Sequence, residues 1–165
     1  MTNKILIAYH SVTGHTKTVA EAIQAQTGGE IFEITPNHFY SSDVNDYEAL
    51  TKQAKKEYET NFRPELKKIL TNIENYDTIF IGSPNWWSTV SIPIYSLLEN
   101  LDTTGKTIIP FITHGGGGLS NTISDLKKLC PKANVLEPIE VHVTRANGFH
   151  VNVQEEVTKG VQQIT

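Results

Sequence analysis

Short, mostly apolar stretches recur along the chain and alternate with segments of a different pattern. Short runs that are apolar at consecutive positions are typical of strands buried on both faces of a sheet. Pro36 follows the second stretch, and Pro110 and Pro138 lie within later ones, where a missing amide hydrogen makes a strand less favourable. The predicted strands are residues 5–9, 31–34, 78–81, 107–113 and 135–143.

The segments between these stretches predict helices. In the first of them Val19, Ala20 and Ile23 recur at helical spacing, and the pair Gly28-Gly29 ends the pattern. Pro93 suits the first turn of a later helix, where its missing amide hydrogen costs nothing. The predicted helices are residues 16–26, 46–58, 64–73, 93–101, 119–129 and 153–164.

The alternation of strands and helices predicts an α/β fold in which parallel strands are joined by right-handed helical crossovers. No linker interrupts it, so we expect a single domain over residues 1–165, with helices on both faces of the sheet. Ligands of such sheets lie beyond the carboxyl ends of the strands. The loops after the first, third and fourth strands are therefore the candidate site.

Composition excludes several classes of protein. With 38% hydrophobic and 19% charged residues, the chain is not of the disordered class. The net charge of -4 without a basic patch argues against a nucleic-acid partner. The single cysteine, Cys130, allows no internal disulfide, and no paired Cys/His spacing predicts a metal site. No run approaches a membrane span or a signal-peptide core, so we expect a cytoplasmic protein with no membrane partner.

The loop after the first strand, residues 10–17, combines hydroxyl side chains with Gly14 at the start of a helix. Free amide hydrogens at such a turn can hold a phosphate, and hydroxyls add donors without positive charge. The sequence is neither GxxxxGK[ST] nor GxGxxG, which argues against a nucleoside triphosphatase and a dinucleotide-binding unit. The alternative is a simple helix cap.

The other two loops carry aromatic residues and glycines. Both tryptophans, Trp86 and Trp87, follow the third strand, where at least one is expected to form a stacking wall for a ligand. The alternative is that they pack into the core. After the fourth strand, residues 115–118 are all glycine, which allows close approach of the backbone to a flat or anionic ligand. A flexible connector is the alternative there.

Together these loops resemble a known family. The pattern Ser11-x-Thr13-Gly14-x-Thr16 matches the phosphate loop of flavodoxins, [T/S]-x-T-G-x-T. With the Pro84-x-Trp86-Trp87 loop and the glycine loop, nearly the whole chain resembles short bacterial flavodoxin-like proteins that have a P-x-W-W loop. The resemblance implies a three-layer α/β/α flavodoxin-like fold, a five-stranded parallel sheet of order 2-1-3-4-5, and FMN as the cofactor.

The resemblance also implies the residues that bind FMN. The first loop would hold the phosphate through Ser11, Val12, Thr13, Gly14, His15 and Thr16. One side of the isoalloxazine ring would be lined by Pro84, Asn85, Trp86 and Trp87. The other side would be lined by Thr113, His114, Gly115, Gly116 and Gly117.

The resemblance leaves three functions open: an electron carrier, an NAD(P)H-dependent reductase of a quinone or similar acceptor, and a regulatory flavoprotein without turnover. The partner would be a redox protein or a small-molecule acceptor, with NAD(P)H as a candidate donor. Two departures from typical carriers favour an enzyme. The fourth-strand loop has no aromatic between His114 and Ile123, and residues 10–17, 83–91 and 113–124 contain no Asp or Glu. Catalytic residues are not predicted.

Overall fold

A computed structural model describes residues 4–37, 40, 47–144 and 147–165, and it has the predicted α/β architecture. Five parallel strands form the sheet in the order β2-β1-β3-β5-β7, which is the predicted order of the five main strands. These strands are β1 (Ile5–Tyr9), β2 (Glu30–Glu33), β3 (Thr78–Trp86), β5 (Thr107–His114) and β7 (Ile139–Thr144).

The expected strand number of five is too small. The described sheet has 8 strands, because three two-residue strands pair with the edges and ends of the longer ones. A hairpin after β3 and a hairpin after β7 supply two antiparallel strands, and a parallel strand precedes β7. The additional strands are β4 (Thr89–Val90), β6 (Asn134–Val135) and β8 (Gly148–Phe149).

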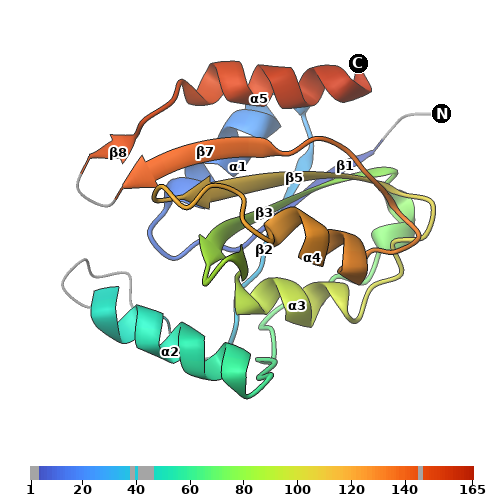
Figure 1. Ribbon diagram of the computed structural model, residues 1–165. Helices are drawn as coiled ribbons and strands as arrows, with labels where there is room; N and C mark the ends of the chain where they lie inside the picture. Colours follow the sequence, from blue (N-terminus) through green and yellow to red (C-terminus); the bar gives the residue numbers. More distant parts are fainter. Residues whose placement is uncertain (1–3, 38–39, 41–46, 145–146) are drawn as a thin grey trace.

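Helices cover both faces of the sheet, as expected for three layers (Figure 1). One face carries α1 (His15–Thr27) and α5 (Val153–Val161), and the opposite face carries α3 (Ile92–Leu98) and α4 (Thr122–Leu129). The remaining helix, α2 (Tyr47–Glu59), lies at the margin beside α3. Its predicted first residue, Asp46, lies outside the described residues. Two 3-10 turns, η2 (Ile73–Asn75) and η3 (Gln162–Ile164), complete the elements.

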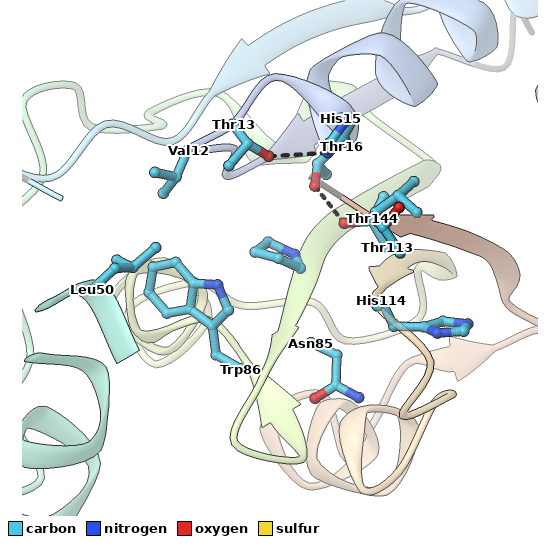
Figure 2. Close-up of a pocket in the computed structure, with 13 residues that line it drawn as sticks. Val12, Thr13, His15, Thr16, Leu50, Asn85, Trp86, Thr113, His114 and Thr144 are labelled. Atoms are coloured by element: carbon cyan, nitrogen blue, oxygen red, sulfur yellow. Dashed lines mark hydrogen bonds between the residues drawn. The ribbon is translucent and has the colours of Figure 1, made fainter. Parts of the chain in front are cut away.

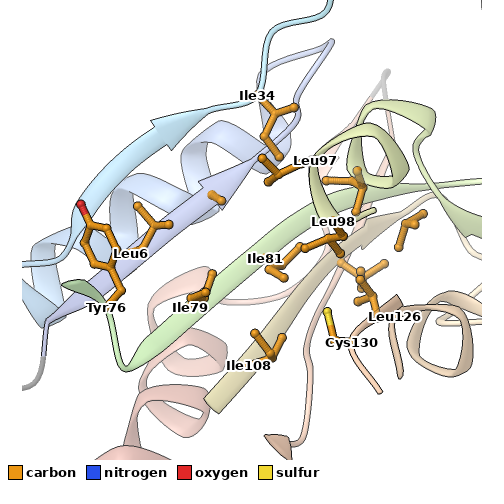
Figure 3. Packing of buried hydrophobic residues seen from close by; sticks show 14 residues of the cluster. Leu6, Ile34, Tyr76, Ile79, Ile81, Leu97, Leu98, Ile108, Leu126 and Cys130 are labelled. Carbon is orange, nitrogen blue, oxygen red and sulfur yellow. The ribbon is translucent and has the colours of Figure 1, made fainter. Parts of the chain in front are cut away.

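Alternate strand residues enter two separate apolar clusters, one on each face. Leu6 and Ile79 belong to the cluster under α3 and α4 (Figure 3). Their neighbours Ile7 and Phe80 belong to the cluster under α1 and α5. Side chains alternate between faces along a strand, so a strand covered on both sides is apolar at most of its positions. No helix in the described part of the chain is long and apolar enough to cross a membrane.

Pro110 lies within the central strand β5 without breaking it. The Leu136 amide donates to the Ile108 carbonyl, so Ile108 faces the β6–β7 side of β5. Pro110, two residues further on, faces the same side. The register of β6 ends opposite Ile108 and that of β7 begins opposite Phe111. The missing amide hydrogen of Pro110 therefore falls in the gap between β6 and β7, where no ladder bond is lost.

The predicted helix over residues 64–73 is wrong. Its first part is extended, and Leu66 forms an isolated antiparallel bridge with Pro36. The Lys67 amide donates to Thr35, so the backbone bonds with a distant segment rather than with itself. Leu66 and Leu70 still pack on the core, whereas Ile69 is 81% exposed. Helical spacing of apolar residues did not predict the structure here, because the backbone hydrogen bonds of this segment are made with a distant segment.

Candidate functional site

A cavity of about 630 Å³, the main cavity, lies at the carboxyl ends of β1, β3, β5 and β7 (Figure 2). Small-molecule sites typically enclose ~300–1,000 Å³. All three predicted loops contribute to it. The predicted residues that line it are Val12, Thr13, His15, Thr16, Pro84, Asn85, Trp86, Thr113, His114 and Gly115. Ser11, Gly14, Trp87, Gly116 and Gly117 were also predicted and are not among its lining residues.

The turn between β1 and α1 presents hydroxyls beside a helix start. Gly14 caps α1 with a φ of 94°, a left-handed conformation in which a side chain would be strained. Its amide donates to the Ser11 hydroxyl at 3.1 Å. Ser11 and Gly14 therefore shape the turn, while the exposed Thr13 hydroxyl lines the main cavity and contacts His15 Nδ1 at 3.1 Å. Helix N-termini favour anions, because their first amide hydrogens lack partners within the helix.

A buried hydroxyl pair joins this turn to β5. The Oγ1 atoms of Thr16 and Thr113 lie 2.9 Å apart, and both residues are buried. A hydroxyl can donate one hydrogen bond and accept two, so the pair retains capacity for a ligand. The first turn of α1 and the carboxyl end of β5 thus form one polar surface, which is seen in Figure 2.

An aromatic cluster forms the opposite part of the main cavity. Trp86 meets Tyr40 and His10 edge to face, with ring centroids 5.1 Å and 5.4 Å away respectively. Tyr40 donates its hydroxyl to the Glu57 carboxylate at 2.8 Å. Burial, followed by this carboxylate, raises the pKa of Tyr40, so the phenol stays protonated at neutral pH. The Tyr40 ring that packs against Trp86 is therefore uncharged.

Hydrogen bonds of two serine hydroxyls connect the end of β1 to the segment that carries Trp86. His10 Nδ1 lies 2.8 Å from the Ser91 hydroxyl, and both residues are buried. The Ser91 amide in turn donates to the Ser83 hydroxyl at 2.8 Å. This chain of bonds fastens the end of β1 to the hairpin that carries Trp86.

Trp87 occupies a different position from Trp86. It and Ser88 form the two-residue turn between β3 and β4, with φ values of 52° and 73°. Both central residues of a type I′ turn have positive φ, which disfavours bulky side chains. Tertiary bonds hold the turn, because Trp87 Nε1 donates to the Thr51 carbonyl at 2.9 Å and the Ser88 carbonyl accepts from Asn121.

A smaller cavity of about 320 Å³, the side cavity, lies between this turn and α2. Trp87 lines it and remains 53% exposed. The two cavities adjoin, since Leu50, Asn85 and Trp86 line both. The other lining residues of the side cavity are Thr51 and Ala54.

The glycine loop is tied to the aromatic hairpin. Asn85 Nδ2 donates to the Gly118 carbonyl at 2.8 Å. Gly115 lines the main cavity, Gly116 and Gly117 lie at the exposed surface, and Gly118 is half-buried. Hydrogen bonds of this kind distinguish the loop from a free connector.

Sequence reasoning missed three lining residues: Leu50, Val143 and Thr144. Val143 and Thr144 end β7, so the rule that ligands lie beyond strand carboxyl ends would have found them if applied to the fifth strand. Leu50 belongs to a polar helix distant in sequence, and no local signal marks it. Within the described ranges, no three or more His, Cys, Asp or Glu side chains are grouped to hold a metal ion.

Comparison with known proteins identifies a family and several solved structures that are similar to this chain. A family model described as Flavodoxin matches residues 4–148. A Bacteroides eggerthii protein provisionally assigned as a flavoprotein is 31% identical with a TM-score of 0.82, and the match covers 99% of this chain and 98% of that one. A similarly assigned protein from Bacteroides uniformis is 28% identical, with a TM-score of 0.80 and coverages of 98% and 99%.

The fold is also shared with a flavoprotein from Lactobacillus acidophilus that was crystallised in complex with FMN. That chain is 24% identical with a TM-score of 0.75, and the match covers 97% of this chain and 99% of that one. No curated protein sequence matches this chain.

Proposed function

This chain belongs to the flavodoxin family, and from that premise we propose that it binds FMN in the main cavity and uses it for electron transfer. One observation carries the proposal: the structure brings the β1–α1 hydroxyls, Trp86 and the glycine loop together around one cavity. The Lactobacillus acidophilus flavoprotein, which has the same fold, was crystallised with FMN. When bound, FMN supplies the redox chemistry, and the protein binds and orients it.

The residues of the hydroxyl turn fit a phosphate monoester. Thr13 is exposed to the main cavity, and the start of α1, a position that favours anions, lies beside it. Among the described lining residues, none carries a carboxylate that would repel an anion. Thr13 and Thr16 would donate to the phosphate, while Ser11 and Gly14 keep the turn open. A hydrogen bond to a charged group contributes ~1.5–3 kcal/mol.

The other lining residues fit a flat, mostly apolar ring. Trp86 and Leu50 form an apolar wall, and Val12 lies across from them in Figure 2. Gly115 has no side chain, so its backbone can approach a ring closely. Apolar walls with a few placed polar groups are typical of cofactor sites.

A second candidate function is an NAD(P)H-dependent reductase of a quinone or similar acceptor. The side cavity favours it, because space for a second molecule adjoins the main cavity at Leu50, Asn85 and Trp86. The lack of carboxylates among the described lining residues also favours it. Negative charges close to the ring would disfavour the anionic two-electron reduced flavin.

The proposed function is tested first by binding. Apoprotein titrated with FMN should quench the flavin fluorescence stoichiometrically, and the same titration with FAD should not. For variants of the threonines that line the main cavity, Thr18→Val is the matched control. It also removes a threonine hydroxyl from the first turns of α1, but that hydroxyl bonds to the Gly14 carbonyl and does not line the main cavity. Absence of FMN binding in the unaltered protein would contradict the proposal.

The two candidate functions are separated by reduction. NADPH is added anaerobically to the FMN-loaded protein without a partner reductase, and the flavin absorbance is followed. Rapid bleaching that reverses on addition of a quinone is expected of a reductase. An electron carrier would keep its absorbance until a partner reductase is supplied.

A further inference from the structure

His114 lies at the centre of the glycine loop. The amides of Gly116 and Gly118 donate to its Nδ1 atom at 3.1 Å and 3.2 Å. The loop therefore closes around one ring nitrogen that belongs to the last residue of β5. Gly116 and Gly118 have φ values of 126° and 71°, so both depend on the absence of a side chain.

The contacts select one tautomer of His114. A nitrogen that accepts amide hydrogens carries no proton, and a neutral imidazole then has its proton on the other nitrogen. His114 Nε2 lies 2.9 Å from Glu140 Oε1, so the protonated Nε2 donates a hydrogen bond to that carboxylate. The side chain of His114 is 8% exposed and that of Glu140 is 47% exposed. A buried neutral ring thus links the loop to β7.

Other ionisable groups face His114 only from the β7 side in the described structure. His142 stacks on it, with ring centroids 5.2 Å apart and planes 9° from parallel. His150 stacks on the far side of His142 at 4.5 Å. Glu140 is the charged group that contacts His114 directly.

We propose that His114 is the positioning residue of the cofactor site, holding the glycine loop through unprotonated Nδ1 and releasing it on proton uptake. A proton on Nδ1 would face the two amide hydrogens of Gly116 and Gly118, so both bonds would break. The released loop would no longer hold Gly115 against the main cavity or the Gly118 carbonyl against Asn85. Cofactor affinity should therefore fall as the pH falls. This inference rests on the proposed FMN site.

The first test needs no cofactor. Long-range ¹H–¹⁵N NMR spectra of the apoprotein report which ring nitrogen carries the proton, and the expected result at about pH 8 is Nε2. The Gly116 and Gly118 amide resonances should shift together with the His114 ring as the pH is lowered. A proton on Nδ1 at about pH 8, or glycine amides that do not follow the ring, would overturn the proposal.

The second test uses three variants in FMN titrations between about pH 8 and 5, the range in which histidine usually changes charge. The amide oxygen of His114→Asn replaces Nδ1 as an acceptor but takes up no proton. His114→Ala removes the acceptor. His150→Gln changes the exposed end of the histidine stack and is the matched control, because His150 stacks on His142 and bonds to Thr144 but does not itself line the main cavity or bond to the glycine loop.

At about pH 8, His114→Ala should bind FMN about tenfold more weakly than the unaltered protein, and His114→Asn should bind nearly as tightly. Lowering the pH should weaken FMN binding by the unaltered protein and by His150→Gln about tenfold more than FMN binding by His114→Asn. The phosphate monoester of FMN also takes up a proton near pH ~6. This affects FMN binding by all variants equally, so it cancels when the pH profiles of the variants are compared.

Equal pH profiles for the unaltered protein and His114→Asn would overturn the inference, as would full affinity in folded His114→Ala. Circular dichroism checks that each variant is folded. If the unaltered protein binds no FMN at about pH 8, the proposed function fails, and the NMR experiment still decides whether His114 holds the loop.

Discussion

The two ends of the main cavity are built in different ways. The hydroxyl end consists of Thr13, His15 and Thr16, which are close in sequence, joined by Thr113 of β5. The aromatic end consists of Trp86 and Leu50, backed by Tyr40 and His10, and these come from separate segments. The first end depends on one local turn, whereas the second exists only after the chain has folded.

The difference has a chemical consequence. At the hydroxyl end, polar groups bond with one another at 2.9 Å and 3.1 Å and can exchange those bonds for bonds to a phosphate. At the aromatic end, contacts are apolar and edge-to-face, and they are worth ~0.5–1.5 kcal/mol each. We therefore expect the hydroxyl end to dominate FMN affinity and the aromatic end to control the position of the ring.

The largest effect is expected at the hydroxyl end. Replacing Thr13 with Ala and Thr16 with Val removes two donors to a charged group, which should weaken FMN binding roughly ten- to hundredfold. Thr16→Val keeps the volume of the buried side chain, so the protein should stay folded. Flavin fluorescence titration measures the affinity, with Thr18→Val as the control. Unchanged FMN affinity in the double variant would show that the phosphate does not bind at the hydroxyl end of the main cavity.

The next effect separates the two tryptophans. FMN should quench the emission of Trp86, which lines the main cavity, more than that of Trp87, which lines only the side cavity. In the single-tryptophan variant Trp87→Phe most of the quenching should remain, and in Trp86→Phe most of it should disappear. Equal quenching in both variants would mean that the ring does not rest against Trp86 in particular.

The smallest effect concerns the alkaline stability of the aromatic end. Burial, followed by Glu57, raises the pKa of Tyr40, and burial, followed by Glu33, raises the pKa of Tyr9 to about 12. A raised folded-state pKa contributes stability that is complete below the unfolded value near ~10 and is lost as pH rises through the folded value.

The urea midpoint should therefore fall above pH ~10, and Tyr40→Phe should show a smaller fall than the unaltered protein. The control is Thr18→Val, because the hydroxyl that it removes does not ionise in this pH range. An equal fall in Tyr40→Phe would show that the aromatic end does not limit alkaline stability.

Several features of the fold were predictable for identifiable reasons. Residues 5–9 and 79–81 are hydrophobic at every position because the strands they form are covered on both faces. Gly28 ends α1 in the left-handed conformation, with a φ of 72°, as its position after the helical pattern indicated. The prediction failed at residues 64–73, where backbone pairing with residues 35–37 replaced a helix despite helical spacing.

The amino-acid sequence by itself predicted the alternation of the five main strands with most of the helices, the loops that line the main cavity, and the hydroxyl turn with Gly14. These features follow from interactions between residues close together in the chain, so a local pattern is enough to specify them. Tertiary structure alone decided that Leu50 joins the site, that Trp86 rather than Trp87 lines the main cavity, and that His114 holds the glycine loop. Each of these contacts depends on where separate segments pack in space, and the pattern of residues along one segment does not contain that information.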